Sequence, residues 1–348
     1  MSVRPDAGRR AACGAIVGSL LVLLGACSNA SSGTTTTGTL TTSTSSPTHP
    51  APAPGTIFVA NGGGGQVAGA SGTGDGSVTA YRPSATGNAR PIVVLTEGIK
   101  YPISLTFDSS GDLWVLDASG DVVEYSRADL ARASPTPTVT VDSPSLNGSG
   151  IGLALDPSGD LWVTNVGTAV VELTKPQLAR SGAPAARVTI THTVCSPTFD
   201  ASGDLWNSNK GTVFEFTKAQ LRKSGSPTPR ITISSGSLSS PCRPTFDASG
   251  NLWAANYFAN SVVEFTKAQL EKSGFPTAAV TISSAPLSSP GDLSFDSSGD
   301  LWVPNAGTDA VFEFTKAQLA ESGAPAPAKS ISGPATGLNW PWASAIEP

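Results

Sequence analysis

An eight-residue motif returns five times along this chain of 348 residues, and it constrains the fold more than any other feature. Each copy has the form Phe/Leu-Asp-x-Ser-Gly-Asp/Asn-Leu-Trp. The copies end at Trp114, Trp162, Trp206, Trp253 and Trp302, so that they are spaced by 48, 44, 47 and 49 residues. A period of this length is typical of propellers and solenoids, in which one supersecondary unit is repeated around or along an axis.

Each copy belongs to a longer unit with one order of elements. A short apolar strand ends at the Asp, and Asp-x-Ser-Gly then has the composition of a tight turn, since Gly tolerates a positive φ. Leu-Trp-Val-x-Asn follows as a second strand, a Val-Val-Glu-Phe-like stretch as a third, and a segment after Pro, such as residues 229–233, as a fourth. Four antiparallel strands per unit predict a propeller blade.

Short helices are expected between the third and fourth strands. Segments of the form Thr-x-x-Gln begin at Thr174, Thr217, Thr266 and Thr315, and all four end in Ser-Gly shortly before a Pro. Thr followed three residues later by Gln is a capping box, which begins a helix, and Gly followed by Pro ends one. We therefore predict one to two helical turns on the outer rim. Their repetition favours a cover for the sheet edge over a set of partner-binding helices.

The two ends of the chain complete a sixth blade. Residues 341–347 copy the first-strand pattern of residues 102–108, and residues 55–61 copy the second-strand pattern of residues 111–117. The C-terminus therefore supplies the innermost strand of a blade whose other three strands come from the N-terminal side. The sequence predicts an all-β, six-bladed propeller over residues 55–348, closed by pairing between its two ends.

The residues before this domain have the layout of an export signal. Arg4, Arg9 and Arg10 precede an apolar run over residues 11–26, which is short for a membrane span. This run ends in Leu24-Gly25-Ala26-Cys27, which resembles the bacterial lipobox. The resemblance implies that residues 1–26 are a lipoprotein signal peptide and that Cys27 carries the lipid, palmitate included. The alternative is an ordinary signal peptide with a chance Cys.

Residues 27–54 are expected to be a tether rather than part of the fold. Residues 28–54 contain no Asp, Glu, Lys or Arg and are rich in Ser, Thr and Pro, a composition that does not form a core. The predicted location is extracytoplasmic, at the bacterial cell membrane through the lipid on Cys27. A net charge of −5 gives no basic surface for nucleic acid, so no nucleic-acid partner is expected, and a monomer is.

The repeats over residues 55–348 resemble NHL-type propellers and the wider six-bladed group that holds gluconolactonase-type lactonases and virginiamycin B lyase. The resemblance rests on the Phe-Asp-x-Ser-Gly-x-Leu-Trp-Val pattern. It implies the fold, whereas such propellers serve as enzymes, sensors and scaffolds alike. The function must therefore be sought where the sixfold pattern breaks.

Enzymatic chemistry is disfavoured at those breaks. The resemblance implies that a lactonase holds a divalent metal with acidic and Asn side chains at the channel mouth, where this chain offers only Asp292. One carboxylate is too few for calcium, which takes about 6–8 oxygen ligands. A lyase is expected to use a channel His, and the chain has only His49 in the tether and His192 in a loop. We expect a ligand- or protein-binding module without a cofactor. The alternative is a metal-dependent lactonase- or lyase-like enzyme with Asp292 as a ligand.

Two cysteines stand at the same repeat position of consecutive blades, Cys195 and Cys242. Adjacent innermost strands bring such positions close together, and export places them in an oxidising compartment. A disulfide is therefore predicted, in preference to two free buried thiols.

A candidate ligand site combines aromatic and charged residues that break the pattern on the face bearing the loops between blades. Its residues are Arg243, Tyr257, Phe258, Asp292, Trp340 and Trp342. Exposed aromatics beside a polar pair suit a carbohydrate, a peptide or a side chain of an envelope protein. In the alternative, the two Trp residues only pack the closure. A purely structural protein would instead have a filled channel and no pocket at its mouth.

Overall fold

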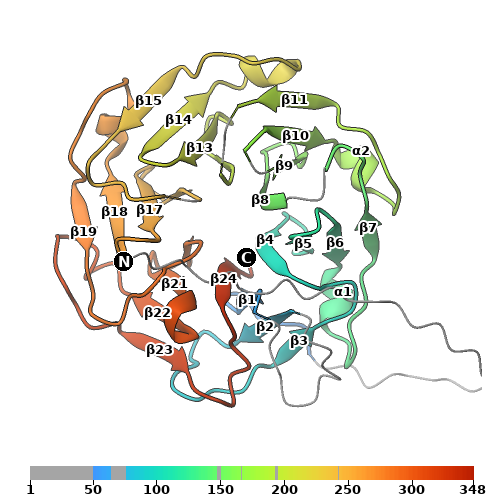
Figure 1. The fold of residues 1–348 in the computed structure, drawn as a ribbon. Coiled ribbons are helices and arrows are strands. Elements are labelled where there is room, and N and C mark those ends of the chain that lie inside the picture. The colour runs from blue at the N-terminus through green and yellow to red at the C-terminus, as the bar shows by residue number, and fades with distance from the viewer. Residues whose placement is uncertain (1–49, 64–75, 147–149, 166, 193–194, 242) are drawn as a thin grey trace, which may run out of the picture. The chain divides into compact units, whose positions relative to one another are not determined.

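The structure is a computed structural model that describes residues 50–63, 76–146, 150–165, 167–192, 195–241 and 243–348. They lie within one compact unit, residues 45–348. They form six four-stranded antiparallel sheets arranged around a central axis (Figure 1). The predicted all-β, six-bladed propeller is therefore confirmed. The predicted signal peptide, Cys27 and nearly all of the tether lie outside the described residues.

In each of blades 1 to 3, the strands lie side by side from an innermost strand at the axis to an outermost strand at the rim. Blade 1 contains β24 (Pro341–Ile346), β1 (Ile57–Asn61), β2 (Ser77–Tyr81) and β3 (Val93–Leu95). Blade 2 contains β4 (Pro102–Phe107), β5 (Leu113–Asp117), β6 (Val122–Tyr125) and β7 (Val139–Val141). Blade 3 contains β8 (Gly150–Leu155), β9 (Leu161–Asn165), β10 (Ala169–Leu173) and β11 (Val188–Thr191).

Blades 4 to 6 have shorter innermost strands. Blade 4 contains β12 (Thr198–Phe199), β13 (Leu205–Asn209), β14 (Thr212–Phe216) and β15 (Ile231–Ser234). Blade 5 contains β16 (Thr245–Phe246), β17 (Leu252–Asn256), β18 (Ser261–Phe265) and β19 (Val280–Ile282). Blade 6 contains β20 (Ser294–Phe295), β21 (Leu301–Asn305), β22 (Ala310–Phe314) and β23 (Lys329–Ser332).

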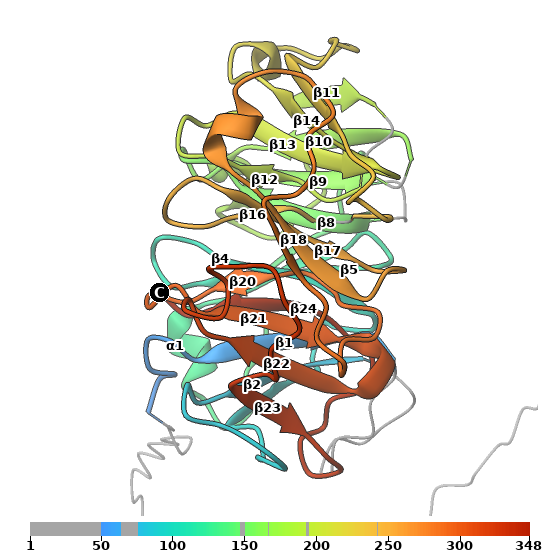
Figure 2. The same ribbon diagram turned by 90° about the vertical axis from the view of Figure 1, so that its left-hand side faces the viewer.

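The two ends of the chain pair and close the ring, as predicted. Strand β24 pairs antiparallel with β1, from Ile346 opposite Ile57 to Pro341 opposite Asn61, with a bulge between Ala60 and Asn61. The C-terminal strand lies near the axis, beside β1 and between β4 and β21 (Figures 1 and 2). Pairing of the two ends leaves no open sheet edge at the point where the ring is joined.

The repeated Asp-x-Ser-Gly segments form the expected turns. In blade 3, Asp156 Oδ1 accepts hydrogen bonds from the N–H groups of Ser158 (2.7 Å) and Asp160 (3.0 Å). Gly159 has a φ of +82°, which a residue with a Cβ adopts only with strain. The same Asp often holds the Trp of its blade as well, since Asp200 Oδ2 accepts from Trp206 Nε1 at 3.1 Å. The Asp residues of the repeated motif are thus structural.

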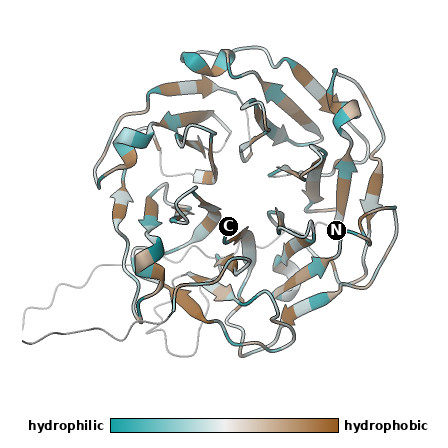
Figure 3. Ribbon diagram, turned by 180° about the vertical axis from the view of Figure 1, so that it is seen from behind, coloured by the Kyte–Doolittle hydropathy of each residue, from teal (hydrophilic) through white to brown (hydrophobic). Residues whose placement is uncertain are grey.

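The core lies between the blades, and the repeated Trp residues fill it. Trp162 is 1% exposed, and its ring meets Phe199 of the next blade edge-on at 6.0 Å. Trp206 meets Phe246 in the same way at 5.9 Å. Hydrophobic residues recur in the strands of each blade (Figure 3). The repeated Trp residues therefore belong to the core between the blades.

The rim segments have the lower end of the predicted length, about one turn, and are less regular than predicted. The α-helical turns are α1 (Arg127–Leu130) and α2 (Lys175–Leu178), and the 3₁₀ turns are η1 (Gln220–Arg222), η2 (Lys267–Leu270) and, in a different loop, η3 (Ala306–Thr308). The segment after Thr315 forms turns without a helix. The capping is nevertheless as predicted, since the N–H of Thr174 donates to Gln177 Oε1 at 2.7 Å. One turn is too short to propagate a regular helix, because nucleation fixes several residues for few hydrogen bonds.

The rim segments cover the sheet edges. Gly182, just after α2, pairs in parallel with Val141 on the outermost strand of the preceding blade, and Gly225 pairs likewise with Ile190. These contacts occupy backbone groups that an exposed edge would leave open. Within the described part of the chain, no helix is both long and apolar enough to span a bilayer.

Candidate functional site

A pocket of about 460 Å³ opens at one end of the channel, on the face where the loops join the blades. Five of the six predicted site residues line it, which are Arg243, Tyr257, Phe258, Asp292 and Trp342. The remaining described walls include Ile103, Ala118, Ile151, Ala255 and Pro290. The structure thus brings together side chains from blades 1, 5 and 6. It also has a pocket at the mouth of the channel, which a purely structural propeller is expected to lack. We call this site the mouth pocket.

The aromatic side of the mouth pocket is built across the closure. Tyr257, in the loop between β17 and β18, stacks on Trp342 of β24 with ring centroids 5.8 Å apart and planes 15° apart. Phe258 meets Tyr257 edge-on at 5.1 Å, and its side chain is 73% exposed. Trp340 lies outside the lining but contacts Trp342 edge-on at 6.1 Å. Trp342 therefore packs the closure and lines the pocket, so the two interpretations of this residue are compatible.

Neighbouring glycines hold Trp342 in place. A Cβ on Gly62 would lie 2.6 Å from Trp342 Cδ1, and a Cβ on Gly291 would lie 2.1 Å from the Trp342 carbonyl oxygen. Only glycine permits such close approach, so these positions fix both the ring and the backbone of Trp342. An aromatic surface fixed in advance loses little conformational entropy when a ligand binds.

The floor of the mouth pocket is an ion pair between Arg243 and Asp292. Arg243 Nε donates to Ser196 Oγ at 2.7 Å, one terminal nitrogen donates to the carbonyl oxygen of Ile151, and the other pairs with Asp292. Burial lowers the pKa of Arg243 to about 9. The guanidinium therefore stays charged at neutral pH, and the adjacent Asp292 carboxylate favours the charged form further.

The contacts of the Arg243 side chain with other blades were not predicted. Arg243 belongs to blade 5 and contacts blades 3, 4 and 6. Aligning the repeats shows which residues occupy equivalent positions, but it does not show these contacts. The signal was present in the residues that share its repeat position, where blades 3 and 4 carry Gly152 and Ser196. A Cβ on Gly152 would lie 1.8 Å from Ser196 Oγ, so this level of the channel is tightly filled. Two small side chains on one side of the ring provide the space that Arg243 occupies.

A second pocket of about 510 Å³ lies at the other end of the channel, and Arg243 and Asp292 line it too. The ion pair therefore separates two chambers. The second chamber has hydroxyl side chains from blades 1, 2, 4, 5 and 6, namely Thr106, Thr198, Thr245, Ser294 and Ser344. Ser294 Oγ and Ser344 Oγ are 2.6 Å apart, so part of this hydroxyl set is satisfied internally.

The polar residues at the ends of the second strands hold loops. Asp117 Oδ2 accepts the N–H groups of Lys100 and Tyr101, both at 2.7 Å. Asn305 Oδ1 accepts the N–H of Ser288 at 2.7 Å. Blade 4 differs, because Asn207 rather than Asn209 accepts from a loop. These oxygens are occupied by backbone donors and do not converge on a metal.

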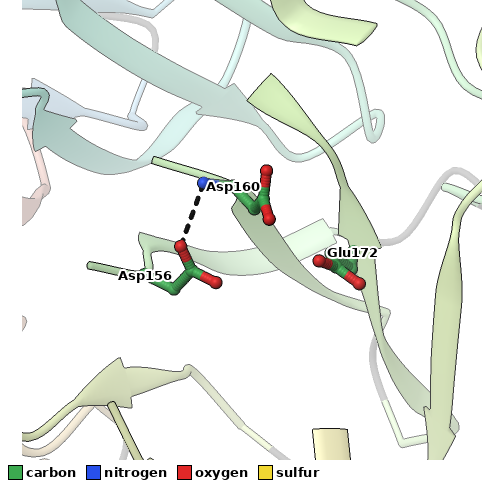
Figure 4. Close-up of side chains that lie close together, drawn as sticks. All are labelled: Asp156, Asp160 and Glu172. Atoms are coloured by element: carbon green, nitrogen blue, oxygen red, sulfur yellow. Dashed lines mark hydrogen bonds between the residues drawn. The ribbon is translucent and has the colours of Figure 1, made fainter. Parts of the chain in front are cut away.

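Acidic side chains gather instead between the strands of single blades. Asp156, Asp160 and Glu172 each place a carboxylate oxygen within 4.8 Å of the others (Figure 4). Glu172 is paired with Arg187, and Asp160 Oδ1 accepts the N–H of Lys175 at 2.7 Å. Burial raises the pKa of Glu172, and Arg187 opposes the rise.

The same group recurs in blade 6 as Asp296, Asp300 and Glu313, with Lys329 in the place of the arginine. A resident cation and a repeated hydrogen-bonding pattern both explain such a group, and the repetition favours the second.

The remaining candidates lie apart from the channel or are only partly described. His192 packs against Phe214, with ring centroids 4.6 Å apart, near the outer strands of blades 3 and 4. Cys195 lines the mouth pocket, and its N–H donates to Asn207 Oδ1 at 3.0 Å. Cys242 lies outside the described residues, as does His49, so the Cys195–Cys242 disulfide stays a prediction.

Comparison with known proteins identifies the fold. No protein-family model matches the sequence, and no curated protein matches it. A solved protein of unknown function from Bacteroides caccae is similar, with a TM-score of 0.59 at 11% identity over 85% of this chain and 100% of that one. The periplasmic gluconolactonase of Pseudomonas aeruginosa has a TM-score of 0.55 at 14% identity, with 84% and 99% covered.

A chain in a nidogen/laminin complex has a TM-score of 0.57 at 14% identity, again with 84% and 99% covered. Similarity at this level of identity shows the fold alone, and propellers of one fold carry different activities. What the comparisons establish is that this chain is a six-bladed β-propeller.

Proposed function

We propose that this protein is a lipid-anchored, extracytoplasmic propeller that binds a ligand or a partner side chain in the mouth pocket. The export signal and the Leu-Gly-Ala-Cys27 sequence support the location. The tether of residues 27–54 lets the domain stand away from the lipid surface. The pocket supports binding, because a concave apolar site with a few convergent polar groups is the common form of a ligand site.

The observation that carries the proposal is the stacked pair of Tyr257 and Trp342. Both residues break the sixfold pattern, and other blades are built without an aromatic residue at these positions. The position of Trp342 carries Ile103 and Gly291 in blades 2 and 6, and the position of Tyr257 carries Ala118 and Ala306 there. Large aromatics near a pocket are the residues on which binding energy most often depends. The fixed ring of Trp342 and the exposed Phe258 provide such a surface.

An enzymatic function is the second candidate, because the gluconolactonase of Pseudomonas aeruginosa shares the fold. It requires Asp292 to hold a metal, and Asp292 is already paired with the buried Arg243. A guanidinium at that place repels a divalent cation. Elemental analysis of the purified protein tests this candidate. A stoichiometric calcium or magnesium ion that Asp292→Asn removes would support the enzyme.

Capture of ligands by the purified chain tests the binding proposal. The protein is equilibrated with fractionated envelope extract and a peptide library, and retained compounds are identified by mass spectrometry. We expect Trp342→Ala and Tyr257→Ala to lose the specific ligand. Phe275→Ala is the matched control, since Phe275 is an 88% exposed aromatic outside the pocket. Undiminished binding by Trp342→Ala would contradict the proposal.

Fractionation of cells tests the anchor. The unchanged protein should sediment with membranes and incorporate labelled fatty acid, whereas Cys27→Ser should remain in the soluble extracytoplasmic fraction. Two acyl chains anchor stably, and a protein without them has no comparable attachment. Membrane association of Cys27→Ser equal to that of the unchanged protein would show that the lipid is not the anchor.

A further inference from the structure

The charge balance of the mouth pocket restricts what can enter it. Arg243 and Asp292 are the only charged side chains among the described residues that line it. They are paired with each other, and their side chains are 9% and 17% exposed. The floor therefore carries no net charge, although it contains two ionised groups.

The charged groups of the floor face protein partners. Arg243 Nε donates to Ser196 Oγ, one terminal nitrogen donates to the Ile151 carbonyl oxygen, and the other is buried against Asp292 in the ion pair without a hydrogen bond of its own. An anionic ligand must displace Asp292 to reach the guanidinium, and a cationic one must displace Arg243 to reach the carboxylate. In either case a buried charge loses its counter-ion. The free-energy cost of leaving a buried charge unpaired is far greater than the free energy that a solvent-exposed ion pair with the ligand would gain.

The walls above the floor are mainly hydrocarbon and aromatic. Ile103, Ile151 and Ala255 face the pocket with no polar side-chain atom, and Tyr257 and Trp342 present a fixed stacked pair. Among the described wall residues, only Ser240 and Tyr257 carry a hydroxyl group, so most hydroxyl groups of a sugar would lack partners there. A flat apolar ring instead meets both the hydrocarbon and the aromatic surface.

From these contacts we infer that the ligand class of the mouth pocket is an uncharged, ring-bearing apolar group, such as the aromatic side chain of a peptide or a small neutral aromatic compound. The inference rests on the proposed binding function and specifies its ligand. The Arg243–Asp292 pair sets the selectivity, because it makes the floor neutral and rejects either sign of charge.

A series of probes of nearly equal size and shape but different charge tests this selectivity. Indole-3-acetamide is neutral, indole-3-acetate is an anion and tryptamine is a cation, and methyl glucoside represents a sugar. Binding to the purified full chain is measured by titration calorimetry at pH 7. We expect the amide to bind at least about tenfold more tightly than the acetate and tryptamine, because a charge buried without a partner is unfavourable.

The variant Asp292→Asn is expected to change the order of the probes' binding affinities. It leaves the Arg243 charge without a counter-ion, so the acetate should now bind at least about tenfold more tightly than the amide. Asp142→Asn is the matched control, because it makes the same change at an exposed residue outside the pocket, and it should leave the native order unchanged. The double variant Arg243→Met/Asp292→Leu keeps the floor neutral and should keep the preference for the amide. Circular dichroism confirms that each variant is folded.

Equal binding of the acetate and the amide to the unchanged protein would overturn the inference, as would binding of methyl glucoside alone. If folded Asp292→Asn binds the probes in the same order of affinity as the unchanged protein, the ion pair does not set the selectivity. If no probe binds but a compound captured from the extract depends on Trp342, the ligand class is wrong and the proposed function stands. If no ligand depends on Trp342, both fail.

Discussion

Buried or half-buried glutamates recur at one position of blades 2 to 6, on the third strand opposite the Trp, as in the pair of Glu124 and Trp114. Blades 3 and 4 place an arginine beside this Glu, whereas blade 2 has Thr138 at the equivalent position. Glu124 therefore has no cation to offset its burial. Burial, followed by the nearby Asp112 and Asp108, raises the pKa of Glu124 to about 7.

This raised pKa predicts a pH dependence of stability. Between the ordinary Glu pKa and about 7, the folded state binds the proton of Glu124 more tightly than the unfolded state does. The free energy of unfolding should therefore fall as pH rises through that range. Glu124→Gln removes the group, so urea midpoints measured between pH 5 and pH 8 should decline less steeply than those of the unchanged protein. Glu321→Gln, on the exposed rim, is the control. Equal slopes for Glu124→Gln and the unchanged protein would contradict the assignment.

The ion pair of the channel predicts strong coupling between its members. Asp292→Leu leaves the buried Arg243 without its counter-charge and should lower the free energy of unfolding by about 3–5 kcal/mol. Arg243→Met added to Asp292→Leu replaces both charges with apolar groups and should recover most of that loss. Urea unfolding at pH 7 of the two single variants and the double variant measures the coupling. A double variant no more stable than Asp292→Leu would show that the pair does not act as a unit.

At the scale of elements, the innermost strands of blades 1 and 6 determine the shape of the mouth pocket. Asp292 forms a parallel bridge with Ala343, and its N–H donates to the Trp342 carbonyl oxygen at 2.8 Å. Gly291, just before Asp292, has room for no side chain. The same contact thus seats β24 and places Asp292 beside Arg243.

Gly291→Ala should therefore disturb both the closure and the pocket. Its Cβ would lie 2.1 Å from the Trp342 carbonyl oxygen, so the backbone of β24 must shift. We expect a loss of about 1–3 kcal/mol in the free energy of unfolding, which is the usual range for forced overpacking. Trp342 fluorescence is hard to isolate among seven Trp residues, so thermal unfolding by circular dichroism is the better measurement. Gly225→Ala, with open space around its Cβ, is the matched control.

At the scale of the whole molecule, stability depends on the ring being closed. Blades 3 to 6 pack on one another through Trp–Phe contacts, and blades 1 and 2 meet through Phe58 and Phe107. Blade 1 is assembled from both ends of the chain. Hydrophobic residues of β24 and β1 belong to one core cluster with residues of β5, so the closing strand also supports blade 2.

Removal of residues 341–348 should open the ring. It exposes the edge of β1 and uncovers the apolar residues of blades 2 and 6 on which Ala343, Ala345 and Ile346 pack, which favours association between chains. We expect the truncated chain to elute as oligomers or aggregates in size-exclusion chromatography and to lose its cooperative thermal transition. A synthetic peptide of residues 337–348 added during refolding should restore part of the monomer. A truncated chain that is monomeric with an unchanged transition would show that closure contributes little.

Much of the fold of this protein can be predicted from the sequence repeats. The strand order, the Asp-x-Ser-Gly turns, the Trp core and the pairing of Ile57 with Ile346 follow from local pattern and from copies at the two ends of the sequence. Rotational repetition also places equivalent residues in a ring, so the sequence predicts that Arg243, Asp292 and Trp342 lie on adjacent innermost strands.

Only the tertiary structure decides which of these side chains touch. Arg243 extends past Ser196 to blade 3 and pairs with Asp292 of blade 6, and Tyr257 turns its face to Trp342. A repeat gives the position of a Cα in the ring but not the direction of a long side chain, which depends on the space its neighbours leave. That space comes from Gly152, Gly62 and Gly291, whose missing side chains matter only when residues from different blades are packed together.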